Sequence, residues 1–242
     1  MPVEKNILLG LRRKAKQFEK AYKLLEDCSG NIEVRNQSST DMIEMDQSID
    51  FIFTDPPFGD FIPYAEVNQI NELWLPATTE RAEEVIISNA SGKTIDSYKE
   101  LLAKVLKESG RVIKPDRHIA VVFHAAKAKV WNAFAESISE AGLEIELSSI
   151  LDKTQATFKQ VVSPGSVQGD PLFLLKKSGY LKETTISDSA ILEQVLLHNS
   201  YNTSLEMRHC YSLYIGQCME QGIQISMDAK QVYEFIKSKG EQ

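Results

Sequence analysis

The spacing of hydrophobic and polar residues changes several times along the chain, and each spacing predicts a different kind of secondary structure. In residues 4–27, apolar side chains recur at helical spacing among lysines and arginines, which predicts an amphipathic helix. The same spacing predicts further helices over residues 64–75, 95–109, 127–141, 187–198, 204–221 and 228–238. The helix that ends near residue 109 is followed at once by Gly110, a typical stop signal.

Short runs rich in β-branched and aromatic residues predict strands between these helices. They lie at residues 31–35, 49–53, 118–123, 143–151 and 170–177. The run IDFIF at 49–53 is apolar enough to be buried on both faces, as central strands of parallel sheets are. Strands that alternate with helices predict an α/β sheet that starts parallel. The last two strands have no helix between them, so we expect an antiparallel hairpin at the end of the sheet.

The pattern changes near Gly179, beyond which only helices are predicted. We therefore expect an α/β domain over residues 1–178 and a helical appendage over residues 179–242. The total of 242 residues suits one large domain, or one domain with an appendage. The acidic composition of the last helices favours a packing role or a role in forming a homodimer.

Charge and cysteine usage narrow the class of protein. The net charge is −7, which lowers the expectation that this chain grips nucleic acid strongly by itself. Its three cysteines are scattered and form no CxxC pair, so we expect no disulfide framework and no metal site. No apolar run approaches the roughly 18 residues of a membrane span, and the N-terminus does not resemble a secretory signal. These features predict a cytoplasmic protein.

One segment carries candidate chemistry. FIFTDPPFGDF at 51–61 places an acid, two prolines, an aromatic residue and a glycine directly after the strand predicted at 49–53. In open α/β sheets, ligands bind beyond the carboxyl ends of the strands. Pro56 and Pro57 have no backbone N–H, so the segment mainly presents hydrogen-bond acceptors. These acceptors are the Asp55 carboxylate and the carbonyl groups of Thr54, Asp55 and Pro56.

Phe58 adds a flat apolar ring beside these acceptors, and Gly59 lets the chain turn away. Acceptors next to an aromatic ring suit a planar ligand with an exocyclic amino group. The acceptors would take the two N–H protons, and the ligand would stack on Phe58.

Asp-Pro-Pro-Phe after a hydrophobic strand resembles the catalytic motif of the DNA amino-methyltransferases, which transfer a methyl group from S-adenosylmethionine to an exocyclic nitrogen. The Asp form is typical of adenine-N6 enzymes, whereas cytosine-N4 enzymes more often begin the motif with Ser. The resemblance runs from about Asn31 to Lys177 and covers the later catalytic half of the large adenine-specific DNA methylases of bacteria and archaea. It is carried, in this order and spacing, by FIFTDPPFGDFIPYAEVNQINELWL, GRVIKPDRHIAVVFH, KVWNAFAESISEAG and TFKQ…GDPLFLLKK.

The resemblance implies a partial class I, Rossmann-like methyltransferase sheet that acts on DNA, as in restriction–modification systems. The target base would be flipped out of the duplex to reach the site. The implied catalytic residues are Asp55, Pro56, Pro57 and Phe58. The implied substrate-binding residues are Gly59, Tyr64, His124 and Lys159. The implied residues for S-adenosylmethionine are Asn36, Ser38, Thr54 and Asp55.

The chain lacks one feature of that family, a Gly-rich cofactor loop after the first strand. SPGSVQGD at 163–170 contains two glycines, but it precedes a late strand and does not open a helix. We therefore expect a fragment, one subunit of a split enzyme, or a decayed copy, with the cofactor loop on a second chain or a missing N-terminal half. The alternatives are a non-catalytic module that binds DNA or a subunit, and an amino-methyltransferase for cytosine-N4 or RNA.

Overall fold

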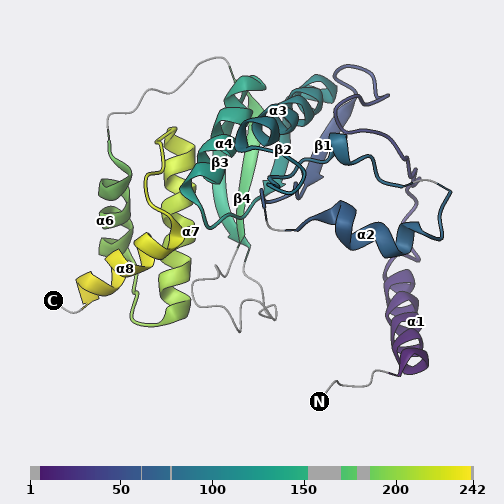
Figure 1. The fold of residues 1–242 in the computed structure, drawn as a ribbon, viewed down its shortest axis with the longest axis horizontal. Coiled ribbons are helices and arrows are strands. Elements are labelled where there is room, and N and C mark those ends of the chain that lie inside the picture. The colour runs from purple at the N-terminus through teal and green to yellow at the C-terminus, as the bar shows by residue number, and fades with distance from the viewer. Residues whose placement is uncertain (1–5, 61, 77, 152–169, 179–185, 241–242) are drawn as a thin grey trace. The chain divides into compact units, whose positions relative to one another are not determined.

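The computed structural model describes residues 6–60, 62–76, 78–151, 170–178 and 186–240 (Figure 1). The chain divides into two compact units, Met1–Gln37 and Ser38–Gln242. None of the described helices is long and apolar enough to cross a membrane.

The N-terminal unit contains the first predicted helix and lacks the first predicted strand. Helix α1 (Ile7–Leu24) begins at Asn6, whose side chain accepts a hydrogen bond from the Leu9 backbone N–H. The strand expected at 31–35 is wrong, since that segment has no strand geometry and Ile32 and Val34 are almost fully exposed. A strand needs a neighbour for its backbone hydrogen bonds, and the described residues provide none here.

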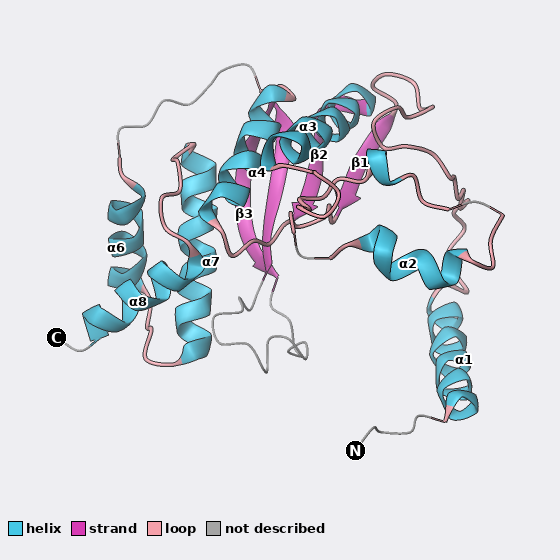
Figure 2. Ribbon diagram, viewed as in Figure 1, coloured by secondary structure: helices cyan, strands magenta, loops and turns pink. Residues whose placement is uncertain are grey.

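The second unit is built on a four-stranded sheet with the order β1-β2-β4-β3 (Figure 2). The strands are β1 (Ile49–Thr54), β2 (Ile113–Val122), β3 (Leu143–Leu151) and β4 (Asp170–Lys177). β1 and β2 pair in parallel, while β4 is antiparallel to both β2 and β3. The predicted α/β class, with a parallel start and an antiparallel end, is confirmed. β1, the helix after it and β2 form the βαβ unit from which Rossmann-like sheets are built.

One face of this sheet is covered by helices, among them α3 (Ile95–Val112) and α4 (Ala128–Glu140), as Figure 1 shows. α3 begins with a capping box between Thr94 and Ser97. Its apolar positions at helical spacing point into the core, against the alternate residues Ile119 and Val121 of β2, which are fully buried. These positions are Tyr98, Leu102 and Leu106. The segment after β1 contains α2 (Tyr64–Glu72) and a 3₁₀ turn, η1 (Arg81–Glu83).

The three C-terminal helices share this core. They are α6 (Asp188–His198), α7 (Ser204–Gln221) and α8 (Ala229–Gly240). Trp131 of α4 donates its indole N–H to the hydroxyl of Tyr211 on α7, and both side chains are fully buried. α7 also packs on β3, where a Cβ on Gly216 would lie 2.5 Å from Ser148 Oγ. The division expected between residues 178 and 179 stays a prediction.

One prediction about β1 is wrong. IDFIF was expected to be buried on both faces, yet Phe51 is 56% exposed and Phe53 is 62% exposed, whereas Ile52 packs against the core. β1 is an edge strand, and only its Ile52 face meets the helix-covered core. The other face has no such cover over Phe51 and Phe53 in the described part of the chain.

Candidate acceptor site at the carboxyl end of β1

The Asp-Pro-Pro-Phe segment follows the carboxyl end of β1, where Thr54 pairs with Val121 of β2. Asp55 is exposed, while Pro56 and Gly59 are buried. Gly59 has a φ of +70°, a backbone conformation that favours glycine. A Cβ at Gly59 would also lie 3.2 Å from Val130 Cγ1 of α4. The turn after the prolines therefore requires glycine for both reasons.

A buried tyrosine that the sequence interpretation missed fixes the middle of this segment. The Tyr98 hydroxyl of α3 donates a hydrogen bond of 2.7 Å to the Pro57 carbonyl oxygen. Burial raises the pKa of Tyr98 well above its ordinary value, so the hydroxyl keeps the proton that it donates. In the sequence, Tyr98 reads only as one of the apolar positions of α3. Its hydroxyl was the one available sign that a polar partner had to lie inside the core.

Phe58 is half-buried and held by other aromatic side chains. Its ring meets Phe123 edge to face, with centroids 5.5 Å apart and an interplanar angle of 86°. Phe123 in turn stacks on Phe134 of α4 at 4.1 Å. The Phe58 ring also lies 6.0 Å from the His124 ring. Phe58 is therefore held in orientation by the core, and the residue is only partly buried.

His124 and Asp170 meet beside this aromatic cluster. His124 Nδ1 lies 3.5 Å from Asp170 Oδ1, and the two side chains are 14% and 8% exposed. His124 follows β2 and Asp170 begins β4, so neighbouring strands bring them together. The structure thus brings His124 and Phe58 to one place, as the sequence predicted, and adds Asp170, which the sequence interpretation did not include. The assigned roles stay predictions.

Other predicted substrate residues lie around the turn. Beside them Asp60, which was not among the predicted residues, is ion-paired with Lys127 at the start of α4, with 2.5 Å between Oδ2 and Nζ. Tyr64 is the first residue of α2 and is 44% exposed. Lys159 lies outside the described residues.

The predicted cofactor residues are divided between the two units. Thr54 and Asp55 are at the carboxyl end of β1, whereas Asn36 belongs to the N-terminal unit. Ser38 begins the second unit, and four residues later the Met42 N–H donates to Glu108 at 2.8 Å.

Glu108 lies near the end of α3, just before β2 begins. Arg111 contacts the same region, because its guanidinium donates hydrogen bonds to the Asp46 carboxylate and to the Met42 carbonyl. Through these contacts Met42 lies near the amino end of β1, whereas Asp55 follows its carboxyl end. The roles predicted for Asn36, Ser38, Thr54 and Asp55 toward S-adenosylmethionine stay predictions.

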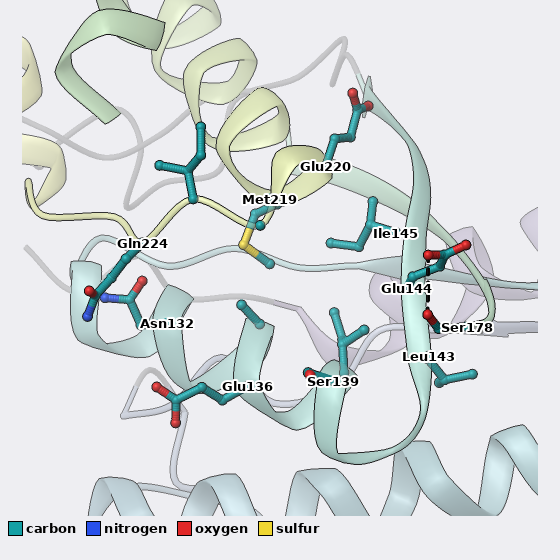
Figure 3. Close-up of a pocket in the computed structure, with 14 residues that line it drawn as sticks. Asn132, Glu136, Ser139, Leu143, Glu144, Ile145, Ser178, Met219, Glu220 and Gln224 are labelled. Atoms are coloured by element: carbon teal, nitrogen blue, oxygen red, sulfur yellow. Dashed lines mark hydrogen bonds between the residues drawn. The ribbon is translucent and has the colours of Figure 1, made fainter. Parts of the chain in front are cut away.

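No group of three or more histidine, cysteine, aspartate or glutamate side chains in the described residues could hold a metal ion. A cavity of about 430 Å³ lies elsewhere, between α4, β3 and the end of α7 (Figure 3). In it, Ser178 donates a hydrogen bond to Glu144 at 3.2 Å. No residue of the Asp-Pro-Pro-Phe segment lines this cavity, so it is distinct from the candidate acceptor site.

No protein-family model matches the chain, and no curated protein matches it. Among solved structures, the chain is similar to the "Putative DNA Modification Methylase" of Thermus thermophilus, with 15% identity and a TM-score of 0.32 over 62% of this chain and 55% of that one. A structure of the same protein complexed with S-adenosyl-L-methionine matches with the same identity and TM-score. The cytosine-N4-specific PvuII DNA methyltransferase matches with 11% identity and a TM-score of 0.37, over 69% of this chain and 62% of that one.

The chain spans between half and two thirds of the length of these solved structures. All of the TM-scores are below 0.5, so the assignment of fold rests on the strand order and pairing of this chain itself.

Proposed function

We propose that this chain is the acceptor half of an S-adenosylmethionine-dependent DNA methyltransferase that modifies the exocyclic N6 amine of adenine. The observation that carries the proposal is the arrangement at the carboxyl end of β1. There an exposed carboxylate, Asp55, begins a segment that Tyr98 holds through the Pro57 carbonyl. Phe58, held by Phe123, supplies the adjoining ring.

The chemistry of the target amine explains the need for such acceptors. The amino nitrogen of adenine shares its lone pair with the purine ring, which makes it a poor nucleophile. Hydrogen bonds from its two N–H groups to Asp55 and to the Pro56 carbonyl draw the nitrogen toward tetrahedral geometry and return the lone pair to it. Tyr98 holds the neighbouring Pro57 carbonyl, so the segment that carries these acceptors needs little reorganisation when the base arrives.

Base stacking completes the acceptor site. An adenine flipped out of the helix loses its stacking neighbours, and the accessible part of the Phe58 ring replaces one of them. Stacking of a base on an aromatic side chain is worth roughly 1–3 kcal/mol. The edge-to-face contact with Phe123 keeps the Phe58 ring from turning away.

The methyl donor that we propose is S-adenosylmethionine, which supplies an electrophilic methyl group on a sulfonium. Of the predicted cofactor residues, Thr54 and Asp55 belong to the segment at the carboxyl end of β1. We therefore propose that the rest of the donor site comes from polypeptide outside the described residues.

Binding of a base can be tested without any methyl donor. We would compare the affinity of the full chain for two single-stranded oligothymidylates, one with a central adenine and one with a central N6,N6-dimethyladenine, by fluorescence anisotropy. The dimethylated base has no N–H groups, so it should bind about tenfold to a hundredfold more weakly, as expected for hydrogen bonds to a charged group.

Asp55→Ala should remove this difference, while the exposed Asp96→Ala in α3 should keep it. Equal affinity of the original chain for both oligonucleotides would contradict the proposed role of Asp55. A central cytosine and its N4,N4-dimethyl form test the alternative substrate, and a larger discrimination for that pair would replace adenine by cytosine.

A further inference from the structure

The loop between β2 and α4, residues 123–127, lies against the acceptor segment. The rings of its first two residues have their centroids 5.5 and 6.0 Å from that of Phe58. Its last residue, Lys127, is ion-paired with Asp60. The loop belongs to neither a helix nor a strand, so the repeating hydrogen bonds of secondary structure do not fix its position. Whatever holds this loop therefore also determines how Phe58 is held.

The end of the loop is held by a distant carboxylate. The first backbone N–H groups of a helix have no partner within the helix, and a side chain at the N-cap position usually supplies one. Lys127 occupies that position before α4 and makes no such bond. Instead, the Ala128 N–H donates a hydrogen bond of 2.6 Å to Oδ1 of Asp228, which directly precedes α8. A negative charge at this end of α4 is also favourable to the helix dipole.

Two further hydrogen bonds join the same loop to the C-terminal helices. The Tyr211 hydroxyl of α7 donates to the Ala125 carbonyl at 3.1 Å, and the Ala229 N–H of α8 donates to the Ala126 carbonyl at 2.9 Å. The Ala125 carbonyl also accepts the indole N–H of Trp131 at 2.9 Å. Tyr211 and Ala125 are both buried, so water does not readily replace a bond that is lost there. The C-terminal helices thus hold the loop by its backbone.

We propose that Tyr211 and Asp228 are positioning residues of the acceptor site. They hold the loop of residues 123–127 where its two rings support Phe58, and they act through that loop. The C-terminal helices are then part of the base-binding site, which goes beyond the packing role that their composition predicts. Their effect on the binding of a base rests on the proposed function, whereas their hold on the loop does not.

Tyr214 is a matched control for Tyr211. Both tyrosines are fully buried and lie about one turn apart on α7. The Tyr214 hydroxyl donates to Asp188 of α6 at 2.8 Å, so its bond stays within the C-terminal helices. Tyr211→Phe and Tyr214→Phe each remove one buried hydroxyl and should destabilise the fold alike. Only Tyr211→Phe removes a bond to the loop, which separates a positioning role from a general effect on stability.

Nuclear magnetic resonance tests the hold on the loop without any nucleic acid. We would record the imidazole ¹H–¹³C signal of His124 in the full chain, assigned with His124→Gln. Tyr211→Phe and Asp228→Ala should shift this signal. Tyr214→Phe should leave it in place, and so should Asp228→Asn, because asparagine caps a helix as well as aspartate does. A signal that neither Tyr211→Phe nor Asp228→Ala shifts would overturn the proposal, as would an equal shift in Tyr214→Phe.

The effect on base binding is measured with the oligothymidylate that carries a central adenine. Tyr211→Phe and Asp228→Ala should each weaken its binding about fivefold, the change expected for the loss of one hydrogen bond. Tyr214→Phe should bind it like the original chain, and an equal loss in Tyr211→Phe and Tyr214→Phe would overturn the positioning role. An original chain that does not distinguish adenine from its dimethylated form would contradict the proposed function, and the His124 signal would still decide whether these residues hold the loop.

Discussion

Two contacts that cross long stretches of sequence hold the acceptor segment. Tyr98 reaches the Pro57 carbonyl from α3, and the close approach of Val130 leaves no room for a side chain at Gly59. Neither contact involves Asp55 itself. The local sequence supplies the acceptors, and distant residues determine where those acceptors are held.

Tyr98→Phe should lower the free energy of unfolding by roughly 1–3 kcal/mol, because it removes the donor to the Pro57 carbonyl in a buried place. Urea unfolding followed by circular dichroism measures the change. Tyr22→Phe is the matched control, since Tyr22 is 69% exposed on α1, and it should change stability by less than about 0.5 kcal/mol. Equal effects of the two substitutions would show that the Tyr98 hydroxyl contributes nothing to the fold.

Gly59→Ala and Gly92→Ala separate conformational strain from steric contact. Both glycines have φ near +70°, so each alanine should cost roughly 1–2 kcal/mol in left-handed backbone conformation. Only at Gly59 would the new Cβ meet Val130 and Ile87, at 3.2 and 3.3 Å, whereas Gly92 has open space. Gly59→Ala should therefore be the more destabilising in the same urea experiment. If Gly92→Ala and Gly59→Ala lower the free energy of unfolding equally, Val130 and Ile87 must move aside at no cost in free energy.

At the scale of elements, one carboxylate joins the C-terminal helices. Asp188, the first residue of α6, is buried and accepts hydrogen bonds from the Tyr214 hydroxyl of α7 at 2.8 Å and from the Ser226 N–H and hydroxyl at 2.7 Å. Burial by itself would raise the pKa of Asp188, but the bonds from Ser226 and Tyr214 outweigh it and the pKa is lowered. Asp188 therefore links α6 to α7 and to the connection before α8 most strongly while it is ionised.

This link predicts a dependence of stability on pH. A lowered pKa in the folded state contributes stability that is fully present above the unfolded value, near 3.9, and is lost as the pH falls through the folded value. Asp188→Asn should therefore destabilise the protein at pH 7, and its difference from the original chain should shrink below about pH 4. Urea unfolding between pH 7 and pH 3 measures this. A difference for Asp188→Asn that stays constant between pH 7 and pH 3 would contradict the argument.

At the scale of the whole molecule, buried and exposed apolar side chains are distributed unevenly along the chain. All but four of the exposed large hydrophobic side chains in the described residues lie in residues 7–75. The four others are Leu147, Leu151, Ile186 and Leu197. The buried hydrophobic residues begin only at Ala65. The core is thus built by the later part of the chain, and the earlier part carries most of the exposed apolar side chains.

This distribution predicts very unequal costs in stability for two phenylalanines of the sheet, on strands that β2 separates. Phe173 of β4 is fully buried against Trp131 and Phe134, so Phe173→Ala should cost about 3–5 kcal/mol. Phe53→Ala should cost less than about 1 kcal/mol in the isolated chain, because most of its side chain already contacts water. Urea unfolding of the two variants decides this, and a large cost at Phe53 would mean that its face is covered in the chain by itself.

The sequence by itself determined the order of helices and strands after residue 48, the antiparallel end of the sheet and the acceptor segment, because periodicity and prolines act locally. It did not determine whether a strand finds a neighbour. For that reason the strand at 31–35 did not form and the burial of β1 on both faces was wrong. Only the tertiary structure brought Tyr98 to Pro57 and Asp170 to His124, since these pairs are separated by 41 and 46 residues and meet only when the sheet and α3 pack together.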